Sequence, residues 1–341
     1  MTDSLPPPPD TTARRGGCRK ILLVLLVLAS LVGGVGAFLY FRYVRPTPRA
    51  HRHLPRGANI ALRADAVELL MFKPVRERLL PLLGGSGEGK APNPILKRLD
   101  ELTGVKLPTD LREIVVGSVD GAQWVMALGG TIEAGRFVDG LEVVLKEAGS
   151  AGWTRDGVVL VHSTGGALGQ AEDGTLVAGT SRSVVLAALT ARDEDPPPEE
   201  LPLPTTGAVT FMMNSRAYRG ALTHLPSILS PVDTLESIDR MNGVLLLSEA
   251  PRVEVQLRPR GVPAAELVGK LESQLSAVKL VLLLSSDDLG GAKRAIASAQ
   301  VSEKNGDVLV SAPWPYDALE DGVANLANLV GLALAHGPFL K

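Results

Sequence analysis

The sequence has a single cysteine, Cys18, and few aromatic residues, which make up 4% of its 341 residues. A lone cysteine excludes a disulfide within the chain, which is compatible with a reducing cytoplasm and with a disulfide-free periplasmic domain. The low aromatic content predicts a core of Leu, Val, Ala and Ile. Because 45% of the residues are hydrophobic, the chain can bury a sizeable core, and we expect two domains.

Clustered positive charge is missing from most of the chain. Residues 1–63 contain ten Lys and Arg against two Asp and Glu, whereas residues 64–341 contain 25 against 35. A surface that binds phosphate backbones needs clustered positive charge, and this acidic body does not supply it. We therefore expect no nucleic-acid partner.

A complete nucleotide-binding motif is also missing. Residues 84–91, GGSGEGKA, have the glycine spacing and the lysine of a phosphate-binding loop, but Ala91 stands where the magnesium-binding Ser or Thr is needed. Such a loop should run directly into a helix, and here Pro92 and Pro94 follow instead. The stretch is predicted to be a flexible turn between two helices.

Other polar residues do not form a convincing active site. His162 and Ser163 are neighbours, and neighbours on a strand point to opposite faces. Asp317, Glu320 and Asp321 share one face of a predicted helix, in its first turns, where carboxylates are stabilised by the helix dipole. The sequence therefore predicts no catalytic, cofactor-binding or metal-binding residues, no cofactor, and a protein that is not an enzyme.

Residues 21–41 form an uncharged apolar run that predicts one transmembrane helix, about 31 Å long at ~1.5 Å per residue. Basic residues flank both ends, and Tyr40 and Tyr43 are placed like an interfacial belt. The alternative is a cleaved signal peptide, because residues 35–37 are small, but the run exceeds the usual apolar region of about 7–15 residues. We predict an uncleaved anchor.

The flanking charges do not decide the orientation of this anchor. The short polar tail, residues 1–20, favours a cytoplasmic N-terminus and a body on the periplasmic side of the inner membrane. The opposite orientation would make the body a cytoplasmic scaffold.

Residues 42–56 are rich in arginine and proline and predict an extended stem, about 45 Å long at ~3.1 Å per residue. The alternative is a basic patch on anionic headgroups, with about 1 kcal/mol from each basic residue. His51 and His53 lie in this stem without a nearby Cys or His cluster, so a metal site is not expected.

The remaining sequence predicts an α+β fold with helices packed on a largely antiparallel sheet. The first module, residues 57–190, begins with a strand at 57–64 and a helix at 66–72 for which Asp65 is the N-cap. An acidic, proline-rich linker follows at 191–205. The second module, residues 206–341, repeats the order of elements, which indicates a tandem repeat.

Further elements follow from apolar spacing and turn residues. Strands are expected at 113–118, 122–128, 158–162, 175–178, 208–214, 244–248, 253–257 and 307–311. Helices are expected at 75–83, from 94 to Gly104, at 136–148, 184–189, 216–225, from 263, at 289–299 after a cap at Asp287-Asp288, and at 316–336. The apolar run 278–284 is too short to span a bilayer and is expected to be buried.

Two stretches, LPRGANIALRADA at 54–66 and LDELTGVKLPTDLREIVV at 99–116, carry a resemblance. With the basic tail and anchor before them, they resemble bacterial single-pass, membrane-anchored envelope proteins with a tandem α+β body, of the domain-of-unknown-function type. The resemblance covers most of residues 54–330. It implies an anchored envelope protein and supplies no activity and no catalytic residues.

The sequence therefore favours an extracytoplasmic protein that binds an envelope protein or a small apolar ligand. The alternative is a membrane-tethered hydrolase or transferase whose site no motif reveals. A broad exposed apolar patch would favour the binding protein, and a strongly shifted carboxylate or histidine in a deep pocket would favour the enzyme.

Overall fold

The structure is a computed structural model that describes residues 50–82, 94–150, 152–190, 206–222, 232–283 and 291–336. The chain divides into two compact units, Met1–Pro46 and Thr47–Lys341, and all described residues belong to the second. Within the described residues, no helix is both long enough and apolar enough to cross a membrane. The predicted span 21–41, the turn 84–91 and the linker 191–205 lie outside them.

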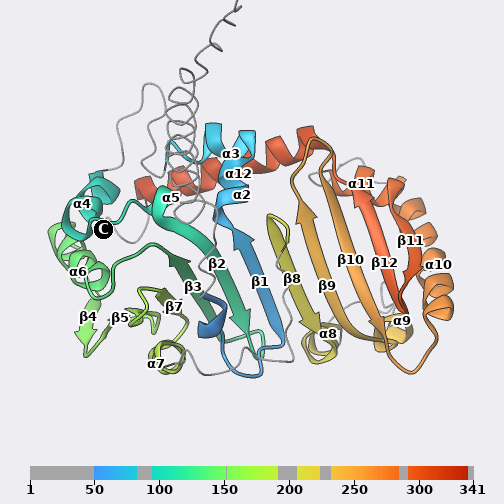
Figure 1. Ribbon diagram of the computed structural model, residues 1–341, viewed down its shortest axis with the longest axis horizontal. Helices are drawn as coiled ribbons and strands as arrows, with labels where there is room; N and C mark the ends of the chain where they lie inside the picture. Colours follow the sequence, from blue (N-terminus) through green and yellow to red (C-terminus); the bar gives the residue numbers. More distant parts are fainter. Residues whose placement is uncertain are drawn as a thin grey trace, which may run out of the picture. The chain divides into compact units, whose positions relative to one another are not determined.

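The second unit contains one twelve-stranded sheet in the order β11-β12-β10-β9-β8-β1-β2-β3-β7-β6-β5-β4 (Figure 1). Every pair of neighbouring strands is antiparallel. The strands are β1 (Ile60–Asp65), β2 (Leu111–Ser118), β3 (Trp124–Gly130), β4 (Trp153–Asp156), β5 (Val159–His162), β6 (Ala167–Gln170), β7 (Leu176–Gly179), β8 (Val209–Asn214), β9 (Ile238–Leu246), β10 (Arg252–Pro259), β11 (Gln300–Lys304) and β12 (Asp307–Pro313). The prediction of an α+β fold with an antiparallel sheet is confirmed.

Helices follow the first strand and the first hairpin in each half of the sheet. They are η2 (Ala50–His53), α2 (Ala66–Met71), α3 (Lys73–Arg78), α4 (Pro94–Thr103), α5 (Leu107–Asp110), α6 (Phe137–Glu147), α7 (Arg182–Leu189), α8 (Ser215–Leu222), α9 (Val232–Glu236), α10 (Ala264–Leu283), α11 (Ala292–Ser298) and α12 (Tyr316–His336). The N-cap of α2 is Asp65, as predicted, since its side chain accepts hydrogen bonds from the N–H groups of Val67 and Glu68.

The two halves of the sheet meet through their first strands. Strand β1 pairs with β8 from Ile60 opposite Met213 to Ala64 opposite Val209. Strands β2 and β3 continue the sheet on one side, and β9 and β10 continue it on the other (Figure 1). Residues on both sides of 191–205 therefore share one sheet, while the proposed division into modules stays a prediction.

Opposite residues on paired strands point to the same face, so the registers define two faces of the sheet. We name them the Arg63 face and the Leu62 face after neighbouring residues of β1. On the Leu62 face, α4 and α6 pack against the first half, and α8, α9 and α10 pack against the second half. On the Arg63 face, η2 and α7 cover the first half.

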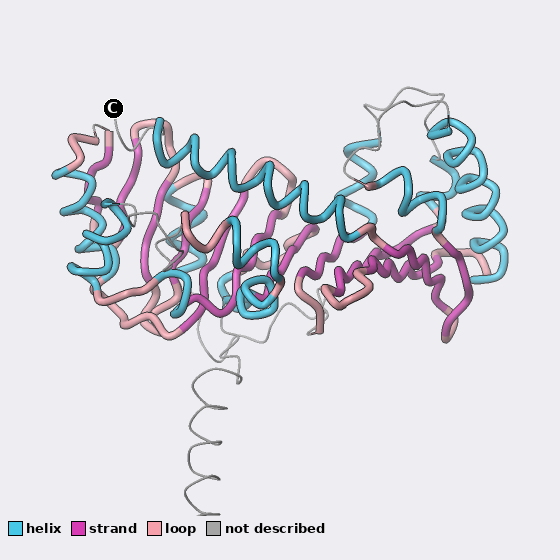
Figure 2. The backbone as a smooth tube through the Cα atoms, turned by 90° about the horizontal axis from the view of Figure 1, so that it is seen from above, coloured by secondary structure: helices cyan, strands magenta, loops and turns pink. Residues whose placement is uncertain are grey.

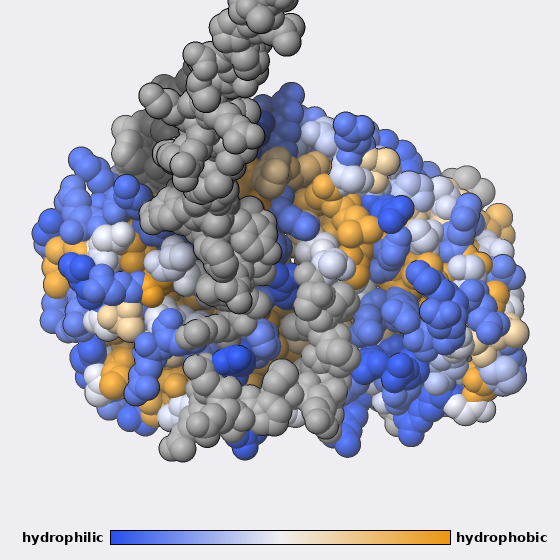
Figure 3. All heavy atoms as spheres, viewed as in Figure 1, coloured by the Kyte–Doolittle hydropathy of each residue, from blue (hydrophilic) through white to orange (hydrophobic). Residues whose placement is uncertain are grey.

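Among the described elements, no helix covers the Arg63 face of the second half. Figure 1 shows no helix across β9, β10 and β12 on the side turned to the viewer, and hydrophilic residues cover most of this area in Figure 3. Because α10 packs against the Leu62 face of these strands, the open side is the Arg63 face.

Helix α12 links the second half to the first. In Figure 2 a long helix runs across the sheet strands, and contacts identify α12 as the neighbour of α3. The rings of Phe72 and Tyr316 meet edge to face with centroids 5.5 Å apart. Arg78 Nη2 and Glu320 Oε1 are 3.0 Å apart beside them.

The structure corrects the predicted stem at its C-terminal part. Residues 50–53 form the 3₁₀ helix η2 and are not extended, and residues 42–49 lie outside the described residues. Ala50 and Leu54 are buried in a cluster with Ala61 and Val115 of the sheet. Small and apolar side chains between the arginines therefore dock this segment on the Arg63 face.

Three further details differ from the predictions. Helix α11 begins after Gly291, which is its N-cap, and not at 289 after Asp287-Asp288. The run 278–283 is the end of α10, where Val278 and Leu280 are exposed, because a helix turns only part of its side chains toward the sheet. The short strands β4, β6 and β11 were not predicted.

Candidate functional site

A buried ion pair lies on β1 and β2, the two central strands of the twelve-stranded sheet. Arg63 Nε donates to Glu113 Oε1 at 2.5 Å, and Arg63 Nη2 lies 3.3 Å from Asp65 Oδ2. The side chains of Arg63 and Glu113 are almost completely buried. Since desolvating two charges costs several kcal/mol, the pair is not explained by stability alone.

Four buried polar atoms near this pair have no hydrogen-bond partner: Arg63 Nη1, Glu113 Oε2, Thr210 Oγ1 and Asn242 Oδ1. Glu113 belongs to β2, Arg63 to β1, Thr210 to β8 and Asn242 to β9. These four strands are neighbours in the sheet. Thr210 lies directly opposite Arg63, and Asn242 lies two residues from the partner of Thr210 on β9. All four side chains therefore lie on the Arg63 face. Unpartnered buried polar atoms are rare in proteins and mark places where water or a ligand binds.

A cavity of about 290 Å³ opens beside these atoms on the second half of the sheet. It is lined by Asn242, Val244, Glu254, Gln256, Lys304, Asn305 and Leu309. Asn242 belongs both to this lining and to the unpartnered set. Its ionisable side chains are those of Glu254 and Lys304.

The Leu62 face carries an apolar row at the same central strands. Met126, Val116, Leu62 and Phe211 follow one another across β3, β2, β1 and β8. Leu62 is 38% exposed and Met126 is 39% exposed, although both lie in the interior of the sheet. The row lies between the helices of the first half and those of the second, which leave it partly open.

His53 connects the N-terminal segment to the sheet. Its Nδ1 lies 2.7 Å from the carbonyl oxygen of Ala188, near the end of α7, and its Nε2 lies 3.4 Å from Asp173 Oδ2. Both partners only accept hydrogen bonds, so the contacts suit the doubly protonated ring. The end of a helix also favours a positive charge. His53 is thus a buried anchor point of this segment.

Two pKa shifts accompany this segment. Burial alone would raise the pKa of Asp173, but hydrogen bonds from His53 and Thr175 hold it well below 3.8. Burial lowers the pKa of His51, although the nearby Glu113 acts in the opposite direction. Neither residue lines the cavity.

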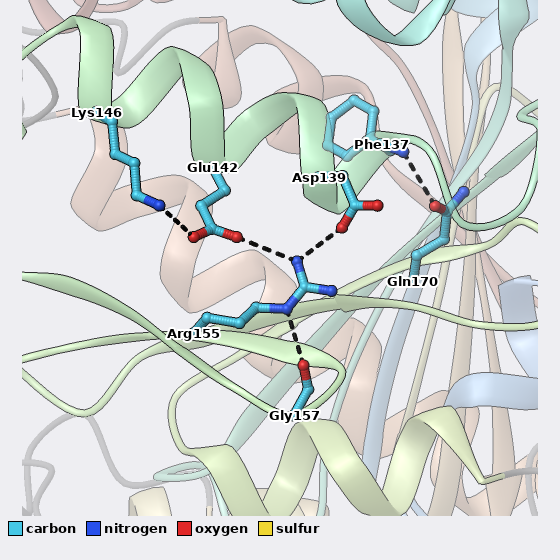
Figure 4. A network of polar contacts seen from close by, with 7 residues as sticks. All are labelled: Phe137, Asp139, Glu142, Lys146, Arg155, Gly157 and Gln170. Carbon is cyan, nitrogen blue, oxygen red and sulfur yellow. Dashed lines mark hydrogen bonds and ion pairs between the residues drawn. The ribbon is translucent and has the colours of Figure 1, made fainter.

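The polar network in Figure 4 joins the β4–β5 hairpin to α6. Arg155 Nη1 lies 2.9 Å from Asp139 Oδ1 and 3.4 Å from Glu142 Oε2, and Lys146 Nζ lies 2.7 Å from Glu142 Oε1. Arg155 also donates through Nε to the carbonyl oxygen of Gly157 at 2.8 Å. Lys146 and Asp139 are exposed, and Arg155 and Glu142 are partly exposed, so each pair contributes about 0–1 kcal/mol. The network fastens the hairpin and does not form a site.

The polar residues that the sequence offered as possible site residues lie in separate parts of the structure. His162 Nδ1 lies 2.7 Å from Thr164 Oγ1 at a turn. Asp317 pairs with Arg294 at 2.8 Å, and Glu320 reaches Arg78. Within the parts of the chain that the structure describes, no group of three His, Cys, Asp or Glu residues could hold a metal ion.

The sequence alone did not point to Arg63, Glu113, Thr210 or Asn242. The available signal was that Arg63 shares its strand face with the apolar Ala61, which indicates a buried charge. The positions of Thr210 and Asn242 beside it depend on the pairing of β1 with β8 and could not be predicted.

No family model matches the chain, and a comparison with curated proteins found no match. Among solved structures, crystal form III of TP0453 is similar with 10% identity and a TM-score of 0.45, covering 84% of this chain and 100% of that one. Crystal form I of TP0453 gives 10% identity and a TM-score of 0.42, covering 81% and 97%. These values carry no conclusion about function.

Proposed function

We propose that this protein is a membrane-anchored binding protein of the cell envelope that holds an apolar segment of a partner protein against the Leu62 face. The proposal is carried by the exposed row of Leu62 and Met126 in the middle of a sheet. An apolar surface that stays open between two groups of helices is typical of a protein interaction site.

The anchor and its orientation belong to the same proposal. Residues 21–41 form the membrane helix, residues 1–20 are cytoplasmic, and the body lies in the periplasm. Because η2 is docked on the sheet from Ala50 onward, only residues 42–49 separate the body from the membrane helix. Eight extended residues reach at most about 28 Å, so the partner must be accessible close to the bilayer.

The proposed tandem modules are supported by the order of elements. Each half has a first strand, a helix, a hairpin and a second helix before its outer strands. The first strands, β1 and β8, pair with each other. The first half has the additional hairpin β4–β5.

Site-specific crosslinking tests the interaction surface. A photoreactive amino acid at position 126 in the full chain should give one discrete adduct in cells, and the variant Leu62→Gln should reduce its yield severalfold. The same amino acid at position 158, which is exposed on the β4–β5 turn, is the matched control and should give no such adduct.

Purified full chain in lipid nanodiscs provides a second measurement. It should bind the dye 1-anilinonaphthalene-8-sulfonate, and the double variant Leu62→Gln/Met126→Gln should lose most of this signal, whereas Val158→Gln should not. Equal adducts at 126 and 158, an adduct with the mass of two copies of this chain, or unchanged dye binding would each overturn the proposed surface.

The topology is tested separately by reporter fusions at the C-terminus. A reporter active only in the periplasm should be active, and one active only in the cytoplasm should be silent. The reverse result would contradict the envelope assignment and leave a cytoplasmic scaffold as the remaining proposal.

A further inference from the structure

The Arg63 face is polar over the second half and lies on the opposite side of the sheet from the proposed interaction row. Its cavity between β9, β10 and β12 is separate from the Leu62 face. A ligand site in this cavity is therefore independent of the proposed interaction row on the Leu62 face.

The cavity continues the line of unpartnered buried atoms. Val244 lines it and lies directly opposite Thr210, which is fully buried. Opposite side chains in an antiparallel pair are about 5 Å apart at Cβ, so Thr210 lies beside the cavity. Asn242 is in the cavity wall, and its Oδ1 has no partner. A buried group left unpaired costs about 1–3 kcal/mol, which a bound hydrogen-bonding molecule would offset.

The lining restricts the chemistry of that molecule. Its one carboxylate, Glu254, is already paired with Arg252 at 2.9 Å, and the amide of Gln256 donates to Asp307 at 2.6 Å. Lys304 brings one positive charge, so the formal charges of the two ionisable lining residues, Glu254 and Lys304, sum to zero. The lining therefore has no excess charge of either sign, and a neutral molecule fits it better than an anion or a cation.

The polar groups of the lining, together with Thr210, call for both donors and acceptors on the ligand. Asn242 Oδ1 accepts, Lys304 donates, and the hydroxyl of Thr210 does either. A hydroxyl group on the ligand can both donate and accept a hydrogen bond. Val244 and Leu309 provide an apolar wall for the C–H groups of such a molecule. A volume of about 290 Å³ lies at the small end of ligand pockets, which start at roughly 300 Å³.

We infer that the cavity between β9, β10 and β12 binds a small neutral polyhydroxylated molecule, of the size of a monosaccharide, through Asn242 and Lys304 with Thr210 beside it. The nearby buried pair of Arg63 and Glu113 keeps the inner end of this face polar.

Ligand-observed saturation-transfer NMR on the full chain in lipid nanodiscs tests the inference. The probes are D-glucose and myo-inositol, with glycine and inorganic phosphate as charged comparisons. A neutral probe should show saturable transfer, and Asn242→Leu should weaken its apparent affinity at least tenfold. Asn325→Leu makes the same chemical change at an exposed position of α12 and should leave the affinity unchanged.

Two further variants guard against misfolding of Asn242→Leu. Lys304→Ala changes the exposed last residue of β11 at the rim and should weaken binding severalfold while the thermal transition stays in place. Thr210→Val removes a buried unpartnered hydroxyl and should keep or raise the stability of the free protein while weakening binding.

Several results would overturn the inference. Transfer of equal strength in all variants would show non-specific association, and transfer only to glycine or phosphate would refute the neutral class. No transfer to any probe would mean that the cavity holds water only.

Discussion

Replacing Asp173 by Asn tests whether His53 anchors the N-terminal segment as a buried cation. Asn keeps the shape of the side chain and removes the negative charge that faces His53 Nε2 at 3.4 Å. Removing one partner of a fully buried ion pair costs about 3–5 kcal/mol. The His53–Asp173 contact is longer than an ideal charged hydrogen bond, and Asp173 is 14% exposed, so we expect about 2 kcal/mol.

Thermal unfolding of the full chain, followed by circular dichroism in detergent, measures this loss. For a domain of this size, about 2 kcal/mol corresponds to a decrease in Tm of roughly 5 °C. Asp156→Asn is the matched control, because it breaks an ion pair with Arg182 in which both side chains are about half exposed. The control should lose less than about 1 kcal/mol.

The pH dependence provides a second check with a defined sign. The folded-state pKa of Asp173 lies below its ordinary 3.8, so its contribution is fully present above 3.8 and is lost as the pH falls toward the folded-state value. The stability difference between the wild type and Asp173→Asn should therefore be large at about pH 5 and shrink below 3.8. Equal losses in Asp173→Asn and Asp156→Asn, or a difference that grows at low pH, would refute the reasoning.

Five other variants test the packing of the sheet. Glu113→Ala should cost about 3–5 kcal/mol in denaturant unfolding, whereas Arg63→Met combined with Glu113→Leu should be nearly neutral, because no charge then stays buried alone. Phe72→Ala should cost about 3 kcal/mol by loosening α12, while Glu320→Gln on the exposed side of that contact should cost less than about 1 kcal/mol. Gly174→Ala should lower the Tm strongly, since its φ is +91° and a Cβ would lie 2.0 Å from a backbone oxygen.

Local signals predicted most helices and the longer strands. Asp65 caps α2 as expected, and α12 has the predicted bounds 316–336. Capping depends on residues within one turn, so the sequence contains the whole signal. Strands β4 and β11 have only four or five residues with mostly exposed, polar side chains, and their alternation is too short to detect.

Long-range features could not be predicted. The pairing of β1 with β8 joins segments that are distant in sequence, and no local pattern specifies its register. The cavity and its unpartnered atoms depend on that pairing, so they were not expected either. The exposed row at Leu62 and Met126 also depends on where the helices of both halves end.

The pairing of β1 with β8 has a consequence for synthesis of the chain. Ile60 lies opposite Met213, so β1 emerges about 150 residues before its partner. At roughly 5–20 residues per second, the open side of β1 waits about 8–30 s for β8. During this time an unpaired strand edge can join the same edge of another nascent chain. A chain cut before β8 would therefore associate with its copies through β1. In the complete sheet β1 is a central strand, but without β8 it is an edge strand.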